Sequence, residues 1–223
     1  ISENPLVVCS LGDASVTEGE VAEAFQMAAL KQFPIVYIVQ DNDWDISATS
    51  KETRAMNAYE YIKGFKGIEA VTIDGTDFIE CYKVINNIFK SVRTESKPWL
   101  VHAKVPLLNH HTSGVRKEWY RDDLEEATKR DPLPKFRKQL LDLGINEIEL
   151  FSIEEEVTTQ VLADYEIAKA SEDPRPEDLY THDYAPTPIV EEQGVRAPQG
   201  GEAKVMVDCA LFAMQEILAK HPE

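Results

Sequence analysis

The sequence lacks long apolar runs and any excess of positive charge. No stretch approaches the ~20 consecutive apolar residues that a membrane-spanning helix needs, and the first residues lack the basic and then apolar layout of a signal peptide. The formal net charge is −17 over 223 residues, which would repel nucleic acid or an anionic membrane surface. We therefore expect no nucleic acid and no membrane among the partners. An anionic cofactor stays compatible if a metal ion and backbone N–H groups carry local positive charge.

Cysteine is scarce and shows no pairing pattern. The three cysteines, Cys9, Cys81 and Cys209, are widely spaced, and no CxxC sequence occurs. This usage is typical of a reducing cytosol, in which each cysteine acts as a small buried apolar group. The sequence thus predicts a cytoplasmic protein in which the cysteines are buried.

What the sequence does have is an alternation of short apolar runs and amphipathic segments. Runs rich in β-branched residues predict buried strands, and apolar residues at helical spacing between them predict helices. Strands joined by helices pair in parallel through right-handed crossovers, which predicts an α/β fold with a parallel sheet and helices on both faces. The strands are expected at residues 6–11, 35–40, 67–75 and 99–105, with one helix from Glu18 to before Pro34 and another at 77–93.

The second half of the chain is predicted to contain a long loop, helices and a linker. Residues 106–121 show no clear period, and a loop of that length inside a compact domain is usually functional or disordered. Helices are expected at 132–143, 148–170 and 204–220. The last helix must either dock back or open a further domain, because it cannot bury its apolar stripe alone. The expected organisation is a domain over residues 1–170, a linker rich in Pro, Gly and acids over 171–203, and a helix over 204–223.

Two polar residues follow neighbouring strands of the predicted sheet. Asp13 follows the first strand in GDASVTEGE, and Asn42 follows the second in QDNDW. Ligands of open α/β sheets bind beyond the carboxyl ends of the strands, and Mg²⁺ and Ca²⁺ prefer carboxylate and amide oxygens. The helix N-terminus near Glu18 would add backbone N–H groups for a phosphate. Either residue alone is also typical of a turn or an N-cap, so both interpretations stay open.

Longer stretches resemble one enzyme family. The segment from GDASVTEGE to QDNDWDIS resembles the thiamine diphosphate motif, which opens with GDG and closes with an Asn pair. The likeness continues through IDGTDF, HHTSGVRKEWYR and KRDPLPKFRKQLLDLG, and covers residues 1–187. This is the arrangement of the α chain in the decarboxylating first component of 2-oxo acid dehydrogenase complexes. HHTS and DWDIS are most similar to the branched-chain (2-oxoisovalerate) type.

The resemblance implies a thiamine diphosphate-binding fold, incomplete in this chain, with a helical C-terminal extension. Residues 1–170 would be the C-terminal part of the domain that binds Mg²⁺ and the diphosphate. The Mg²⁺ would be held by the side chains of Asp13 and Asn42 and by the backbone carbonyl of Trp44. The diphosphate would lie along Gly12, Ala14 and Ser15.

The resemblance also assigns a role to the loop after the fourth strand. His111 would face the reacting cofactor, where a histidine can stabilise charge or move protons, although a loop histidine without such a role is the plain alternative. Three residues depart from the pattern of the site. Asp41 replaces the first Asn of the pair, which is not usually the metal ligand. Ala14 replaces the second Gly of GDG, and Leu107 stands where relatives have an arginine that reaches the diphosphate. Either Arg116, Lys117 or Arg121 substitutes for that arginine, or cofactor binding is weakened.

The implied function is the oxidative decarboxylation of a branched-chain 2-oxo acid such as 2-oxoisovalerate, with acyl transfer to lipoamide on a lipoyl-bearing acyltransferase. Alternatives are a pyruvate- or acetoin-type enzyme, a transketolase- or synthase-type enzyme, and a non-catalytic assembly module that keeps the fold. Helix 204–220 resembles the opening of the partner β chain, which implies a fused α–β polypeptide that forms a homo-oligomer. We expect that the 223-residue chain alone does not decarboxylate.

Overall fold

The structure is a computed structural model that describes residues 4–112, 114–181 and 204–221. It divides into two compact units, Ile1–Asp164 and Tyr165–Glu223. The division falls inside the helix α7 (Glu147–Lys169). The predicted site residues all belong to the first unit.

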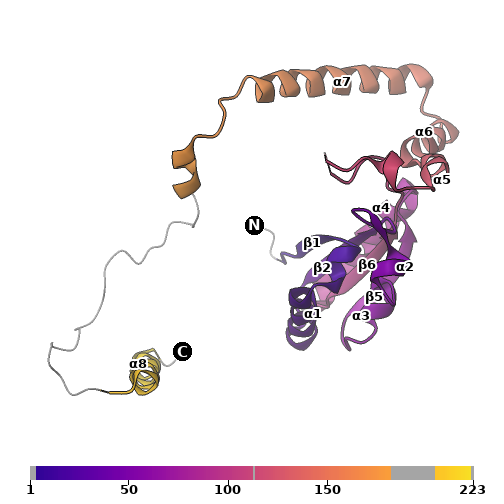
Figure 1. Ribbon diagram of the computed structural model, residues 1–223. Coiled ribbons are helices and arrows are strands. Elements are labelled where there is room, and N and C mark those ends of the chain that lie inside the picture. The colour runs from indigo at the N-terminus through magenta and orange to yellow at the C-terminus, as the bar shows by residue number, and fades with distance from the viewer. Residues whose placement is uncertain (1–3, 113, 182–203, 222–223) are drawn as a thin grey trace. The chain divides into compact units, whose positions relative to one another are not determined.

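A parallel sheet lies at the centre of the first unit (Figure 1). Its strands are β1 (Val7–Gly12), β2 (Ile35–Asp41), β5 (Glu69–Asp74) and β6 (Trp99–Lys104), in the order β1-β2-β6-β5. Each neighbouring pair is parallel, so the carboxyl ends of the strands share one edge of the sheet. The four predicted strands and their parallel pairing are confirmed.

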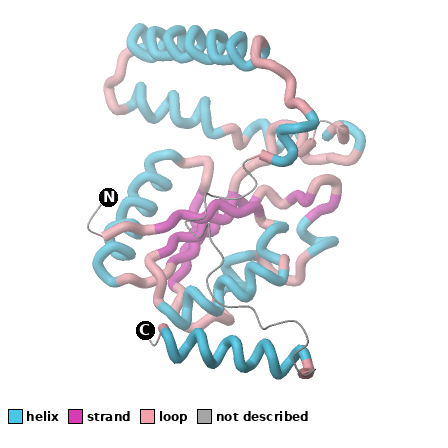
Figure 2. The backbone as a smooth tube through the Cα atoms, turned by 90° about the vertical axis from the view of Figure 1, so that its left-hand side faces the viewer, coloured by secondary structure: helices cyan, strands magenta, loops and turns pink. Residues whose placement is uncertain are grey.

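Helices cover both faces of this sheet, as predicted (Figure 2). Successive residues of a strand point to opposite faces, and β2 shows this clearly. Tyr37 packs in one buried cluster with Phe25 of α1 (Gly19–Lys31) and with α3 (Ala58–Ile62). Val36, its neighbour in the strand, packs in a second cluster with residues of α4 (Phe78–Glu95). The α/β fold class is therefore confirmed.

The segment between β2 and α3 contains short elements that the sequence pattern did not predict. They are the antiparallel pair β3 (Trp44–Asp45) and β4 (Ala48–Thr49), and the helix α2 (Ser50–Thr53). None is long enough to show a hydrophobic period. Capping boxes do mark two helix starts, through Thr49 with Glu52 and through Asn57 with Glu60. This signal was present in the sequence.

The predicted later helices are confirmed where the structure describes them. They are α6 (Pro132–Asp142), α7, and α8 (Met206–Lys220). Shorter helical elements were not predicted: η1 (Ala14–Thr17), η2 (Lys117–Trp119), α5 (Leu124–Lys129) and η3 (Pro176–Tyr180). Residues 182–203 of the expected linker lie outside the described residues. Among the described residues, no helix combines the length and the apolar character that crossing a membrane requires.

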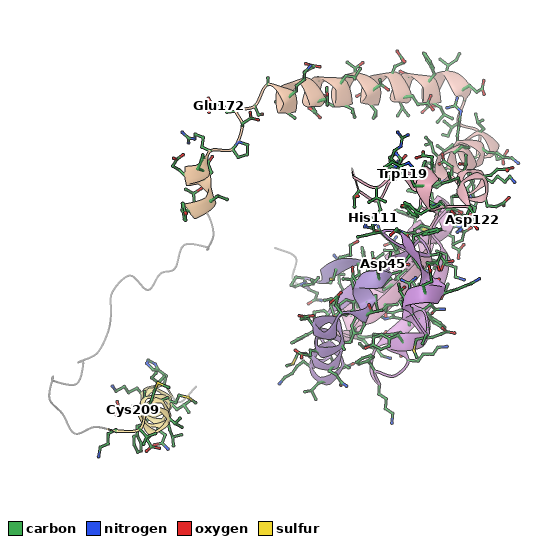
Figure 3. The ribbon with its side chains drawn as sticks, in the orientation of Figure 1. Asp45, His111, Trp119, Asp122, Glu172 and Cys209 are labelled. Carbon is green, nitrogen blue, oxygen red and sulfur yellow. The ribbon has the colours of Figure 1, made fainter. Side chains whose placement is uncertain are left out.

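The prediction that every cysteine is buried is wrong for one of the three. Cys9 and Cys81 are half-buried and pack against the two apolar clusters of the sheet. Cys209 is exposed, because every residue of α8 is exposed in the structure (Figure 3). The thiols of all three are free.

Candidate active site at the carboxyl ends of the strands

Two acids lie next to each other at the ends of β1 and β2. The strands are paired so that Gly12 lies opposite Gln40, which places Asp13 and Asp41 at the same level of the sheet edge. Asp13 is only 4% exposed, because the turn of η1 folds over it. A buried carboxylate requires a charged or hydrogen-bonding partner.

Arg54 supplies that partner. It follows α2 in extended conformation, and its Nη2 donates to Oδ2 of Asp13 at 2.6 Å. The same Nη2 lies 3.7 Å from Oδ1 of Asp41. The side chain of Arg54 is only 6% exposed, so the guanidinium lies between two carboxylates in a largely dry site.

A histidine of the neighbouring strand completes the arrangement. Nε2 of His102 in β6 donates to Oδ2 of Asp41 at 2.6 Å. Its Nδ1 lies 3.1 Å from Oγ1 of Thr72, the residue directly opposite in β5. His102 is 1% exposed. Thr72, His102, Asp41, Arg54 and Asp13, here called the strand-end network, connect the ends of all four strands.

The two acids of this network have opposite pKa shifts. Burial and the hydrogen bond with Asp41 raise the pKa of Asp13, although Arg54 opposes both effects. Burial also acts to raise the pKa of Asp41, but hydrogen bonds from His102, Asp13 and the backbone of Asp43 together hold it well below its usual range. Asp41 is therefore the acid that stays ionised, and Asp13 is the one that more readily holds a proton.

Asn42 and Trp44, the other two predicted metal ligands, lie in one tight turn. The backbone N–H of Trp44 donates to Oδ1 of Asn42 at 2.9 Å, and Asp43 between them has φ +70°. The buried indole of Trp44 donates to Asp123 at 3.1 Å and packs edge-on against Tyr120. The side chain of Trp44 thus anchors the turn, and its backbone carbonyl lies in β3 beside Asn42.

The predicted diphosphate-binding residues lie where a helix follows β1. Ala14 and Ser15 belong to η1, and α1 begins two residues after η1 ends. Gly12 and Ser15 are exposed, and Ala14 is half-buried. Ala14 is not among the described residues with positive φ, so an alanine replaces the family's glycine there without backbone strain.

Two cavities meet at Arg54. One of about 410 Å³ is lined by Asp41, Asn42, Arg54 and Lys104, among others. The second, of about 240 Å³, is lined by Asp13, Arg54 and Tyr61, among others. Together they bring the predicted metal ligands Asp13 and Asn42 to the two sides of one arginine.

His111 is not brought to this place by any contact in the structure. It is exposed on the loop that follows β6 (Figure 3), and no described residue makes a hydrogen bond or ion pair with it. It lines neither of the two cavities. Its predicted role facing a cofactor stays a prediction.

The cations expected to replace the arginine at Leu107 are engaged elsewhere. Arg121 is buried, donates twice to Asp123, and donates to the carbonyl of Leu107 at 2.6 Å. Lys117 donates to the carbonyl of Leu108, and the exposed Arg116 lies 3.4 Å from Glu118. Arg121 therefore secures the loop through Leu107 in this structure.

The donor atoms at the strand ends fit a divalent cation. Mg²⁺ takes hard oxygen ligands, and Asp13, Asn42 and the carbonyl of Trp44 offer a carboxylate, an amide and a backbone oxygen. No cluster of three or more His, Cys, Asp or Glu side chains suited to a metal occurs in the part of the chain that the structure describes. The predicted set needs only one such side chain, so it is compatible with that finding. The guanidinium of Arg54 opposes the binding of a cation by Asp13, because it already pairs with that carboxylate.

Comparison with known proteins decides the family. The sequence profile described as "Dehydrogenase E1 component" matches residues 2–177, a range that contains the whole sheet and the strand-end network. The chain belongs to the dehydrogenase E1 component family. This confirms the resemblance seen in the sequence motifs.

Several relatives in this family are similar over most of the chain. The pyruvate dehydrogenase E1 component subunit alpha of Rickettsia bellii is 32% identical over 81% of this chain and 56% of its own length. The 3-methyl-2-oxobutanoate dehydrogenase subunit alpha of Mycobacterium tuberculosis is 32% identical over 65% of this chain and 40% of its own. The chain thus spans about half the length of these relatives. A solved transketolase from Campylobacter jejuni aligns with a TM-score of 0.39 at 26% identity, over 44% of this chain and 15% of its own.

Proposed function

We propose that this chain is the α-type part of a 2-oxo acid dehydrogenase and that the carboxyl ends of β1 and β2 hold Mg²⁺ and the diphosphate of thiamine diphosphate. The observation that carries the proposal is the family match over residues 2–177. The matched range includes Asp13 and Asn42, which follow adjacent parallel strands. Thiamine diphosphate, when bound, supplies the carbanion stabilisation that decarboxylation requires.

In this proposal, the residues of the chain bind the cation and the cofactor and orient them. Asp13, Asn42 and the carbonyl of Trp44 hold the cation, which compensates the charge of the diphosphate. Gly12, Ala14 and Ser15 lie along the diphosphate, and the first backbone N–H groups of α1 face the same side. His111 approaches the reacting end of the cofactor and holds or moves a proton there. This last step requires the exposed loop after β6 to fold over the strand ends.

The substrate class is proposed to be a branched-chain 2-oxo acid such as 2-oxoisovalerate, with acyl transfer to a lipoyl-bearing acyltransferase in the cytoplasm. The motifs HHTS and DWDIS support the branched-chain type. Relatives named for pyruvate and for 3-methyl-2-oxobutanoate are both similar to this chain, so pyruvate is the first alternative and acetoin the second. Helix α8 supports a fused β-type half, which would supply the rest of the site in a homo-oligomer.

A second function is a non-catalytic assembly module that retains the fold. The specific observation in its favour is the ion pair of Arg54 with Asp13, which occupies the carboxylate that a metal ion would need. The absence of an arginine at Leu107 points the same way.

Calorimetry of the protein that contains this chain separates the two functions. Thiamine diphosphate with Mg²⁺ is expected to bind the wild type, and Asp13→Ala and Asn42→Ala are each expected to lose about 10²-fold or more in affinity. Leu133→Ala, at an exposed position of α6 that lines neither cavity of the site, is the matched control and should bind as the wild type does. No binding by the wild type would favour the module. Steady-state kinetics with 2-oxoisovalerate against pyruvate then ranks the substrates.

A further inference from the structure

We propose that Arg54 is the resident counter-cation of Asp13 and that a divalent cation binds Asp13 only in exchange for the Arg54 guanidinium. The inference rests on the proposed metal site at the strand ends and adds a residue that opposes metal binding there. If Arg54 competes with the cation, removal of its charge should make cation binding tighter. If Arg54 instead supported the site, its removal would make cation binding weaker.

The geometry sets the two cations in competition for Asp13. Nη2 of Arg54 lies 2.6 Å from Oδ2 of Asp13, and the side chain of Asp13 is only 5% exposed. A ligand oxygen lies about 2 Å from Mg²⁺, so an ion bound to this carboxylate would lie within about 4 Å of a guanidinium that stayed in place. Two cations so close in a largely buried site repel each other strongly, which favours exchange of one for the other.

Charge balance favours the presence of one of the two cations. Asp13 and Asp41 are adjacent, and the guanidinium is placed against both, at 2.6 Å and 3.7 Å. Two buried carboxylates without a compensating cation are strongly unfavourable. Arg54 provides one positive charge, and Mg²⁺ would provide two. An exchange therefore keeps the acids compensated, whereas simple departure of Arg54 would not.

The guanidinium of Arg54 also lacks a hydrogen-bond partner for one of its nitrogens, which favours its release from Asp13. Its Nη1 is buried and has no hydrogen-bond partner among the described residues, and such a group costs free energy. Both cavities at the site are lined by Arg54, so a rotation of its side chain has space on either side. The backbone that carries it follows α2, a helix of only four residues.

The test is a Mg²⁺ titration of the protein that contains this chain, by calorimetry without cofactor, for the wild type and three variants. Arg54→Met removes the charge and keeps most of the volume, and it should bind Mg²⁺ about 10-fold tighter or more. Arg54→Lys keeps a positive charge and should fall between the two. Arg137→Met, which removes a half-buried arginine that pairs with Glu154, should leave the affinity unchanged.

Thermal unfolding gives a second readout. In EDTA, Arg54→Met should melt at a lower temperature than the wild type, because the two acids lose their counter-cation. Saturating Mg²⁺ should raise its melting temperature by more than it raises that of the wild type. A structural effect of the substitution alone would lower both values without this larger recovery.

The outcomes distinguish this inference from the proposed function. If the wild type binds Mg²⁺ and a folded Arg54→Met binds it equally or more weakly, the exchange is refuted and the metal site stands. If neither the wild type nor Arg54→Met binds Mg²⁺, both the exchange and the proposed metal site are refuted. If Arg54→Met does not fold, a crystal structure of the wild type with Mg²⁺ decides. An Nη2 that still lies within about 3 Å of Asp13 Oδ2 beside a bound ion overturns the exchange, and a displaced guanidinium supports it.

Discussion

His102 is the residue on which the ionised state of Asp41 depends. It is buried in the middle of the sheet, and its Nε2 donates to Asp41 at 2.6 Å. Burial alone would raise the pKa of Asp41, and the hydrogen bond from His102 is the largest of the effects that lower it. The histidine therefore helps to keep the half-buried carboxylate of Asp41 charged beside Asp13.

We expect His102→Leu to destabilise the protein by about 3 kcal/mol, because the largely buried carboxylate of Asp41 loses a hydrogen-bond donor. Urea unfolding at pH 7 measures this. The folded pKa of Asp41 lies below its unfolded value, so its stabilising contribution is present above the unfolded pKa and lost as the pH falls. The difference between variant and wild type should therefore shrink in acid. His102→Gln retains an N–H donor and should lose less stability, and equal losses in both variants would contradict this role of the hydrogen bond.

The sequence allowed prediction of only some of the residues at the site. Asp13 and Asn42 could be found because each follows an apolar run directly, and parallel strands bring such ends together. His102 left a weak signal as the only histidine inside the run WLVHAKV. Arg54 left none, because its position depends on β3, β4 and α2, which are too short to show a period. A contact across 41 residues is set by packing and cannot be read from local pattern.

At the scale of elements, Asp77 connects two helices. Its side chain accepts from the backbone N–H of Glu80 at 3.0 Å and so caps α4. It also accepts from Gln139 of α6 at 3.1 Å and lies 3.2 Å from Nζ of Lys135. The bond from Glu80 and the bond from Gln139 lower the pKa of Asp77 from 3.8 to about 2.

We expect Asp77→Ala to lower the melting temperature at neutral pH, because both the cap and the link to α6 are lost. The folded pKa is below the unfolded one, so the contribution of Asp77 is complete above its unfolded pKa of 3.8 and is lost as the pH falls toward about 2. Thermal unfolding between pH 7 and pH 2 should show the difference from wild type shrinking over that window.

Two further variants identify which interaction of Asp77 matters. Asp77→Asn keeps a capping oxygen and should retain part of the stability. Gln139→Ala removes one of the two contacts with α6 and keeps the ion pair of Asp77 with Lys135, so it should leave most of the pH-dependent difference in place. If Asp77→Ala lowers the melting temperature by the same amount at every pH, the charge of the carboxylate does not contribute to the stabilisation.

The strands and helices that bury an apolar face could be predicted from the sequence pattern. β2 and β6 are continuous apolar runs because the sheet is covered on both sides, and α4 shows a clear apolar stripe that packs against Val36 and Val101. The helices α2, α3 and α5 have four to six residues each, less than two turns. Their presence depends on caps and on contacts with distant segments, which a search for periodicity does not detect.

At the scale of the whole molecule, the acidic character is compatible with the proposed anionic ligand. The chain carries a net charge of −17, but the two acids at the strand ends have partners: Arg54 pairs with Asp13, and His102 makes a hydrogen bond with Asp41. A cation that enters the site would meet carboxylates already positioned there. The net charge predicts that nucleic acid is not a partner, but it does not predict how the local charge at the strand ends is arranged.

Local stability is expected to differ strongly along the chain, and hydrogen exchange measures it. The amides of β2 and β6 bond to strands on both sides and lie between two buried clusters. In contrast, every residue of α8 is exposed, and a helix of 15 residues without a buried face is marginal in water. We expect amides of α8 to exchange faster than those of β2 and β6 by on the order of 10²-fold or more. If the amides of α8 were as protected from exchange as those of β2, this expectation would be wrong. Such protection would show that the apolar stripe of α8 is buried, which is required of a helix that docks back or opens a further domain.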